Sequence, residues 1–182
     1  MIETKADRLP VAVAVERDSS PEAYRARLAR VAAHLNGFRS VKGRRGLLAV
    51  FRRMGSGECD IPPEPFWGLM ESFHVPRVEE TIWLRLLPLV ARYPHDPATG
   101  PGLAFARARV SAPRLERWLR ADHETAWGEA DRILARVGEA GVDWVRLGVL
   151  LRHWTPELRR ALAREFFRSP EYRSRTTPES GA

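Results

Sequence analysis

The residues of this sequence best suited to chemistry are arginines, which gather in two clusters. The first cluster comprises Lys42, Arg44, Arg45, Arg52 and Arg53. The second cluster comprises Arg107, Arg109, Arg114, Arg117 and Arg120. A guanidinium group suits phosphate because its planar fork makes two parallel, charge-assisted hydrogen bonds. Both clusters are therefore predicted to bind the backbone of a nucleic acid, a contact that carries no base preference by itself.

The overall charge supports this prediction only in part. The chain has 30 Lys and Arg residues against 23 Asp and Glu residues, which gives a net charge of +7, and its pI lies near 10.6. A basic excess is typical of proteins that bind polyanions, because each phosphate contact releases a counterion. However, only Lys5 and Lys42 are lysines, and a GC-rich genome would produce the same bias. Solvated arginines without a ligand are the alternative interpretation.

The spacing of the arginines favours two wet helix faces. Arg45 and Arg52 are separated by two helical turns, so they stack on one face of a predicted helix. The arginines that follow Ser111 spread over the side of another predicted helix that faces away from its apolar residues. That apolar side comprises Leu115, Trp118 and Leu119. Few carboxylates lie nearby in the sequence, and Glu116 is the main exception.

Catalytic and metal-binding motifs are incomplete. His123 and Glu124 begin an HExxH pattern, but Trp127 occupies its fifth position, so the second zinc ligand is missing. Cys59 lies in a Gly- and Pro-rich segment without a CxxC partner, which indicates a bystander thiol. The histidines are scattered, and no GxSxG, P-loop or GxGxxG pattern occurs. The sequence therefore predicts no enzyme, no metal site and no cofactor.

Four tryptophans fall on the apolar stripes of predicted helices, namely Trp118, Trp127, Trp144 and Trp154. Proteins that bind single strands stack bases on exposed aromatic rings. A tryptophan on an apolar stripe, however, belongs to the core several times more often than to such a platform. All four are therefore predicted to be buried.

Helical signals follow one another along the chain. Ser19 or Ser20 can cap a helix that opens at Pro21 and ends at Asn36-Gly37. Further helices are predicted over about 44–54, 66–73, 78–90, 111–119, 127–137, 143–154 and 155–166, with Pro88 kinking or interrupting one of them. Ser111 and Asp143 are placed to cap two of these helices, and Thr155 opens the last one. Val78 is predicted to lie on the apolar face of its helix. Helices joined by short loops, without an alternating βα pattern, indicate an all-α bundle of about eight to nine helices.

The bundle is expected to have two lobes, over about 20–92 and 102–168. The segment 93–101 separates them because it holds three prolines and a glycine. The leader 1–19 and the polar tail 169–182 are expected to be flexible. Within the leader, alternating Val and Ala over 11–15 would suit a short strand, but no later segment offers a partner.

The expected location is the cytoplasm, without a membrane partner. No apolar run approaches the roughly 20 residues that a bilayer-spanning helix needs. The first ten residues lack the apolar core of a secretory signal. Cys59 is the single cysteine, which fits a reducing compartment.

Several ordered motifs cover roughly residues 25–168. In the second half they are RLERWLRAD (114–122), VDW (142–144), HW (153–154), PE (156–157) and AREFF (163–167). In the first half, FRR (51–53) precedes a Pro-rich turn and Phe66. In order and spacing these motifs resemble the CasB family, the small subunit of the type I-E CRISPR surveillance complex Cascade.

This resemblance implies an all-helical, non-catalytic protein that sits as a pair of copies in a complex built on a guide RNA, the crRNA. Family members contact the RNA-bound target strand and the displaced single strand through basic residues, and so stabilise the R-loop in antiviral defence. The implied protein partners are the large subunit and the backbone subunits. Because exchange of DNA duplex for RNA–DNA hybrid is nearly balanced, modest contacts to the strands can decide R-loop stability.

Two other classes of function stay open at this point. The two predicted helices around Trp154-Thr155 would suit a helix-turn-helix in an independent DNA-binding regulator, which would read base edges in one duplex sequence. The tight join at Thr155, which lacks glycine, disfavours this reading. Nothing in the sequence supports an enzyme with a dispersed site. A protein–protein adaptor overlaps with the Cascade hypothesis, because a Cascade subunit must also bind other proteins.

Overall fold

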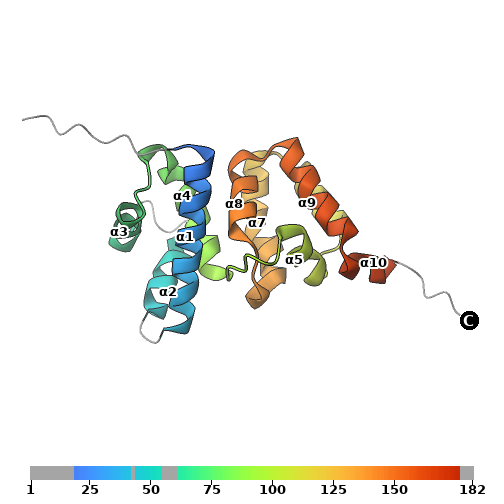
Figure 1. Ribbon diagram of the computed structural model, residues 1–182, viewed down its shortest axis with the longest axis horizontal. Coiled ribbons are helices and arrows are strands. Elements are labelled where there is room, and N and C mark those ends of the chain that lie inside the picture. The colour runs from blue at the N-terminus through green and yellow to red at the C-terminus, as the bar shows by residue number, and fades with distance from the viewer. Residues whose placement is uncertain (1–18, 42–43, 55–60, 177–182) are drawn as a thin grey trace, which may run out of the picture.

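The computed structural model describes residues 19–41, 44–54 and 61–176 (Figure 1). Within these ranges the chain is all-helical, as predicted, and no helix is long and apolar enough to span a membrane. The α-helices are α1 (Pro21–Ser40), α2 (Arg45–Arg53), α3 (Glu64–Ser72), α4 (Glu80–Arg92), α5 (Pro101–Arg107), α6 (Ala112–Arg120), α7 (His123–Val137), α8 (Trp144–His153), α9 (Pro156–Arg168) and α10 (Pro170–Thr176). The short 3₁₀ helix η2 (Arg77–Glu79) precedes α4, and the short 3₁₀ helix η3 (Gly138–Ala140) follows α7.

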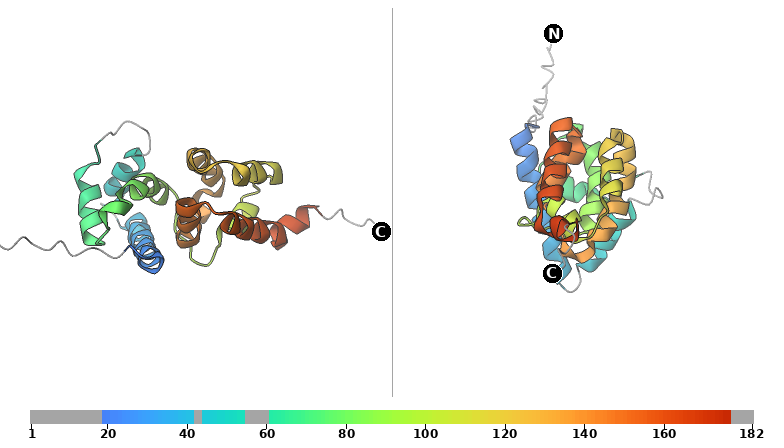
Figure 2. Two further views of the ribbon diagram at one scale, coloured as in Figure 1. Left: turned by 90° about the horizontal axis from the view of Figure 1, so that it is seen from above. Right: turned by 90° about the vertical axis from the view of Figure 1, so that its right-hand side faces the viewer.

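The helices form two groups that lie side by side (Figure 1). In the first group, α2 packs on both α1 and α4. In the second group, α5 packs against α7 and α9, and α10 packs against α5 and α9. α1 and α8 lie against each other where the groups meet. Seen from above, α2 and α6 lie toward one side of the molecule, and α1 and α9 toward the other (Figure 2).

The segment 93–100 connects the two groups and is itself hydrogen-bonded to the start of α8. His95 and Val142 form a parallel β-bridge. Asp96 N donates to Val142 O at 3.1 Å, and Asp143 N donates to Thr99 O at 2.8 Å. The segment thus lies against the second group along its length, and the division of the chain into two lobes stays a prediction.

Capping side chains fix where several helices begin. Ser20, Asp143 and Thr155 each accept a hydrogen bond from a backbone N–H in the first turn of α1, α8 and α9, as predicted. Asp122 caps α7 in the same way, although no cap was predicted there from the sequence. Ser111 occupies the capping position of α6, but its side chain makes no capping hydrogen bond.

The apolar core is continuous across both helix groups. Leu28 of α1, Leu86 of α4 and Leu147 of α8 are all at most 1% exposed. α1 approaches α8 closely because Gly148 has no side chain, and a Cβ atom there would overlap the Leu28 side chain. The buried apolar area between the groups therefore contributes to the stability of both.

A charged network is buried in the same place. Glu79 of η2 is fully buried, and its carboxylate pairs with Arg27 of α1 at 2.7 Å and with Arg152 of α8 at 3.0 Å. Trp83 Nε1 donates to the same carboxylate at 3.3 Å. The Arg152 guanidinium also lies 4.1 Å from the centroid of the Tyr24 ring. This network connects elements from both groups through a single carboxylate.

One sequence prediction about a helix end was wrong. α1 does not stop at Asn36-Gly37 but continues to Ser40, because Phe38 is buried in the core and the Asn36 amide donates to His95 O at 3.3 Å. Tertiary contacts here outweigh the local preference of Asn-Gly for a helix end. Of the two alternatives predicted for Pro88, an interruption is excluded because α4 runs on to Arg92, whereas a kink stays a prediction. The missing proline N–H costs one hydrogen bond, while the proline ring itself is buried.

Two further differences concern single segments. Val78, predicted to face the core, is 80% exposed, because in η2 the neighbouring Glu79 takes the inward position. Where a polar tail was expected, residues 170–176 form α10. The Tyr172 ring packs 5.0 Å from Phe166 and 5.1 Å from Phe167. The 11–15 segment and most of the leader lie outside the described residues.

Candidate nucleic-acid interface

α6 carries the second arginine cluster on a firmly anchored helix. Leu115 and Trp118 are at most 1% exposed, and Trp118 Nε1 donates to Ala126 O at 2.9 Å. The burial of this side orients the opposite side outward. Arg114 and Arg117 are accordingly exposed, as the spacing predicted.

Carboxylates near these arginines are few. Arg114 and Arg117 make no ion pair with any described residue. Arg120 pairs with Glu116 at 3.2 Å, and the Arg120 side chain is 80% exposed while that of Glu116 is 44% exposed. Glu129 of α7 shares a shallow surface depression with Arg117 and Arg120, a neighbour that the sequence reading missed. An exposed pair of this kind contributes about 0–1 kcal/mol, so Arg120 can exchange its carboxylate for a phosphate.

The two arginines before α6 differ from each other. Arg107 is held by Glu171 at 3.0 Å and by the Thr99 hydroxyl at 3.2 Å, so it connects α5 to α10. Arg109 is exposed and has a φ of 54°. Val110 N donates to Phe105 O there, which closes α5 in the left-handed manner that favours glycine. Arg109 therefore adopts a left-handed backbone conformation that glycine would adopt at lower cost.

In the first cluster, Arg44 and Arg45 are both exposed at the start of α2. The Arg44 guanidinium lies 5.2 Å from the centroid of the Phe38 ring. Arg45 makes no ion pair with any described residue, and Arg53 is exposed as well. Lys42 lies outside the described residues.

Arg52 has a structural partner. Its Nε donates to Ala91 O at 2.9 Å, and Arg39 donates to the same oxygen at 3.0 Å. These guanidinium groups satisfy a carbonyl in the last turn of α4, where the helix dipole favours cations. Arg52 is half-buried in this contact, and Arg92 in turn donates to its carbonyl oxygen at 2.9 Å. Its contribution to nucleic-acid binding stays a prediction.

The sequence reading left a third group of arginines unassigned. Arg160, Arg164 and Arg168 of α9 are exposed and follow one another at four-residue intervals. That spacing aligns them along one side of a helix, and it could have identified them. Arg160 approaches α6, where it lines a surface groove together with Arg120.

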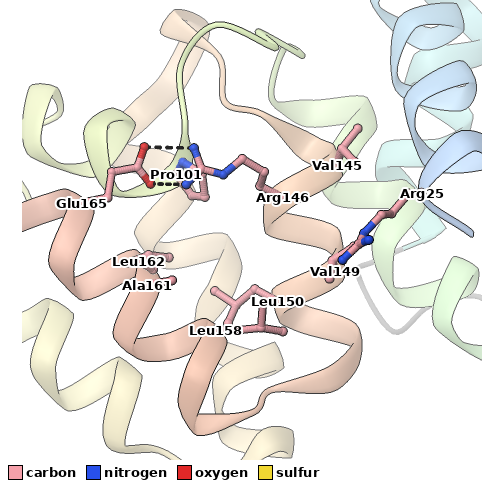
Figure 3. Close-up of a pocket in the computed structure, with 10 residues that line it drawn as sticks. All are labelled: Arg25, Pro101, Val145, Arg146, Val149, Leu150, Leu158, Ala161, Leu162 and Glu165. Carbon is pink, nitrogen blue, oxygen red and sulfur yellow. Dashed lines mark hydrogen bonds and ion pairs between the residues drawn. The ribbon is translucent and has the colours of Figure 1, made fainter. Parts of the chain in front are cut away.

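A separate crevice of about 150 Å³ lies between α1, α8 and α9 (Figure 3). Its walls are mainly apolar, and Arg25 reaches it from α1. Arg146 and Glu165 form a double ion pair at its edge, with N–O distances of 3.1 and 2.8 Å. Glu165 also accepts from Gly102 N at 3.3 Å. These charges hold α5, α8 and α9 together and leave Arg25 as the unpaired cation among the residues drawn.

Among the described residues, the His and Glu of the incomplete HExxH motif do not belong to a metal site. No group of three or more potential metal ligands occurs in the described part of the chain. His123 of the incomplete HExxH motif contacts Leu151 O and the Trp127 indole N–H. Cys59 lies outside the described residues.

The four tryptophans are core residues, as predicted, with exposures of 1%, 6%, 0% and 7% for Trp118, Trp127, Trp144 and Trp154. Each indole N–H has an acceptor; Trp144 donates to Tyr93 O and Trp154 to Ala121 O, both at 2.9 Å. Buried indoles with satisfied donors serve packing. They are therefore not available on the surface as a platform for stacked bases.

The described part of the chain is a basic, all-helical protein with exposed guanidinium groups on α2, α6 and α9. The family model of CRISPR-associated protein Cse2 matches residues 25–167, and the chain belongs to this family, also called CasB. Cse2 is the small, non-catalytic subunit of type I-E Cascade. No curated protein and no solved structure gives a match.

Proposed function

We propose that this subunit holds the target and displaced DNA strands of the R-loop through exposed arginines, and thereby stabilises the R-loop. The observation that carries the proposal is the pair Arg114 and Arg117, which are exposed on α6 and make no ion pair within the described chain. Arg109 extends the same surface toward α5. Guanidinium groups in this state can form bidentate contacts to phosphate without first breaking an internal pair.

A second set of arginines supports the same assignment. Arg44 and Arg45 are exposed on α2, and α2 and α6 lie toward the same side of the molecule (Figure 2). Contacts at both ends suit an extended strand, whose bases are already specified by pairing with the guide RNA. Lys42 and Arg53 are included in the proposed interface because they belong to the same cluster in the sequence. Arg52 and Arg107 would have to serve phosphate in addition to their structural partners.

The proposed protein partners are the large subunit, the backbone subunits and a second copy of this chain. Family membership favours this assembly over an independent regulator. The helix-turn-helix alternative would require a preference for one duplex sequence. The proposed contacts are to phosphates, so we expect no sequence preference from them. Competition between random and selected duplexes separates the two functions.

The proposal is tested by reversing charge on α6. If Arg45, Arg109, Arg114 and Arg117 each contact a phosphate, the logarithm of the affinity for single-stranded DNA falls with the logarithm of salt concentration with a slope of about −3. Arg114→Glu with Arg117→Glu should weaken binding to all sequences and reduce the slope by about 1.4. Arg164→Glu with Arg168→Glu, which makes the same charge change on α9, is the matched control.

Fluorescence anisotropy with the purified chain over a salt series measures both quantities. A slope and affinity unchanged by the α6 reversal contradict the proposal. Equal losses in the α6 and α9 variants also contradict it, because they indicate a response to net charge alone.

A further inference from the structure

A groove of about 310 Å³ lies between α6 and α9. Its floor is apolar and includes Leu119 of α6 with Ala163 and Phe167 of α9. Arg120 and Arg160 line it from the two helices. Arg120 belongs to the second arginine cluster and lies on α6 with Arg114 and Arg117, so the groove adjoins the surface assigned above to the DNA backbone.

The groove is preformed by an internal contact. Arg159 NH1 donates to Leu119 O at 2.8 Å, and its guanidinium lies 5.8 Å from the centroid of the Trp154 ring. This hydrogen bond ties the first turns of α9 to the last turn of α6. The Phe167 ring is fixed in turn by edge contacts to Phe166 and Tyr172, each at 5.1 Å between ring centroids.

The arginines on its rim are available to a ligand. Arg160 pairs with Glu157 at 2.8 Å, one turn earlier on the same helix, and both side chains are about 70% exposed, at 68% and 71%. Arg120 has a similar exposed pair with Glu116. Such pairs are weak because water solvates both partners. A phosphate can replace either carboxylate.

The charge and chemistry of the lining select the occupant. Three arginines line the groove against one carboxylate, that of Glu116, so the groove complements an anion. An apolar floor with an aromatic ring suits the face of a nucleobase, since bases stack on aromatic and guanidinium planes. The volume lies at the lower end of the range of roughly 300–1,000 Å³ for small-ligand sites, which suits one nucleotide.

We propose that this groove binds one unpaired base of a DNA strand, with the flanking phosphates on Arg120 and Arg160. The inference rests on the proposed function and adds to it a contact to a base, which the exposed arginines alone do not make. Stacking tolerates every base because each has a π face. The groove therefore distinguishes single strands from duplex and does not read sequence.

The test compares two probes that carry the same phosphates. One is a short oligothymidylate, and the other is an oligomer of equal length in which every residue is abasic. The full chain should bind the oligothymidylate at least about fivefold more tightly. Ala163→Met, which fills the groove without removing a contact, should abolish this difference and leave the affinity for the abasic probe unchanged.

Two more variants locate the contact. Phe167→Ala should also abolish the difference, and Ala163→Met keeps the test valid should the loss of Phe167 packing unfold the chain. Trp67→Ala is the control, because Trp67 is an exposed aromatic residue on α3, in the other helix group. This variant should retain the full preference for the oligothymidylate.

The outcomes separate the two proposals. Equal affinity of the wild-type chain for both probes overturns the proposed base contact and leaves the proposed contacts to DNA phosphates standing. No binding to either probe overturns both proposals. A preference that persists in Ala163→Met overturns the placement of the base in this groove.

Discussion

The buried carboxylate of Glu79 should be the most sensitive single position in the chain. Glu79→Met removes the carboxylate that forms an ion pair with Arg27, whose exposure is only 5%, and the acceptor of the Trp83 indole. Breaking a buried pair by removing one member costs about 3–5 kcal/mol, because the remaining charge is left uncompensated. For a chain of 182 residues, this corresponds to a Tm lower by roughly 6–20 °C. Urea unfolding followed by tryptophan fluorescence gives the free energy directly.

Two further variants test whether the cost comes from the orphaned charge. Arg27→Met combined with Glu79→Met removes both buried members, while Arg152, with 22% side-chain exposure, can turn toward water. This double variant should recover most of the loss, since apolar replacements of a buried pair are often neutral. Glu124→Met breaks an ion pair with Arg85 whose carboxylate is 77% exposed, and it should change little. The reasoning fails if Glu79→Met lies within about 1 kcal/mol of wild type, or if the double variant is as unstable as the single one.

Two further predictions concern helix packing and capping. Gly102→Ala should lower the free energy of unfolding by about 1–3 kcal/mol, because a Cβ there would lie 2.7 Å from both Leu162 O and Phe166 N. Gly128→Ala, in open space on α7, should raise it by up to about 1 kcal/mol; equal effects in urea titrations would contradict the packing argument. Hydrogen bonds from the backbone and hydroxyl of Thr125 hold the pKa of Asp122 below its usual 3.8. The stabilisation by this capping carboxylate is therefore fully present above pH 3.8 and is lost as the pH falls through the lowered pKa. The difference in Tm between wild type and Asp122→Ala should therefore be constant above about pH 5 and shrink below about pH 4, and a difference that persists undiminished in stronger acid would contradict it.

Much of the fold follows from local patterns. Apolar spacing placed the four tryptophans in the core, because a helix buries residues that recur three and four positions apart. Capping chemistry placed the starts of α8 and α9 at Asp143 and Thr155, because their side chains satisfy N–H groups that the helix cannot. The exposure of the arginines of α6 was also predicted correctly. The helical period that turns the apolar residues of α6 toward the core turns these arginines toward solvent.

The rest depends on contacts between distant segments, which local patterns do not contain. Asn36-Gly37 reads as a helix end, yet a partner 59 residues away, His95, supports the helix through it. Arg52 reads as a surface arginine like Arg45, but its guanidinium group reaches the end of α4. The groove between α6 and α9 has lining residues from two helices far apart in sequence. Its arginines could be counted from the sequence, but their convergence could not.

The hydrogen bonds between segment 93–100 and the start of α8 limit how the molecule can adapt to what it binds. A free linker would let the two helix groups swing as a hinge, but here the crossing chain is fastened at Asp96, Thr99 and His95, and the core continues beneath it. Under the proposed function, a curved or kinked strand would therefore have to conform to a surface of fixed shape. Fine adjustment falls to the long arginine side chains, whose rotamers change at far lower cost than the backbone.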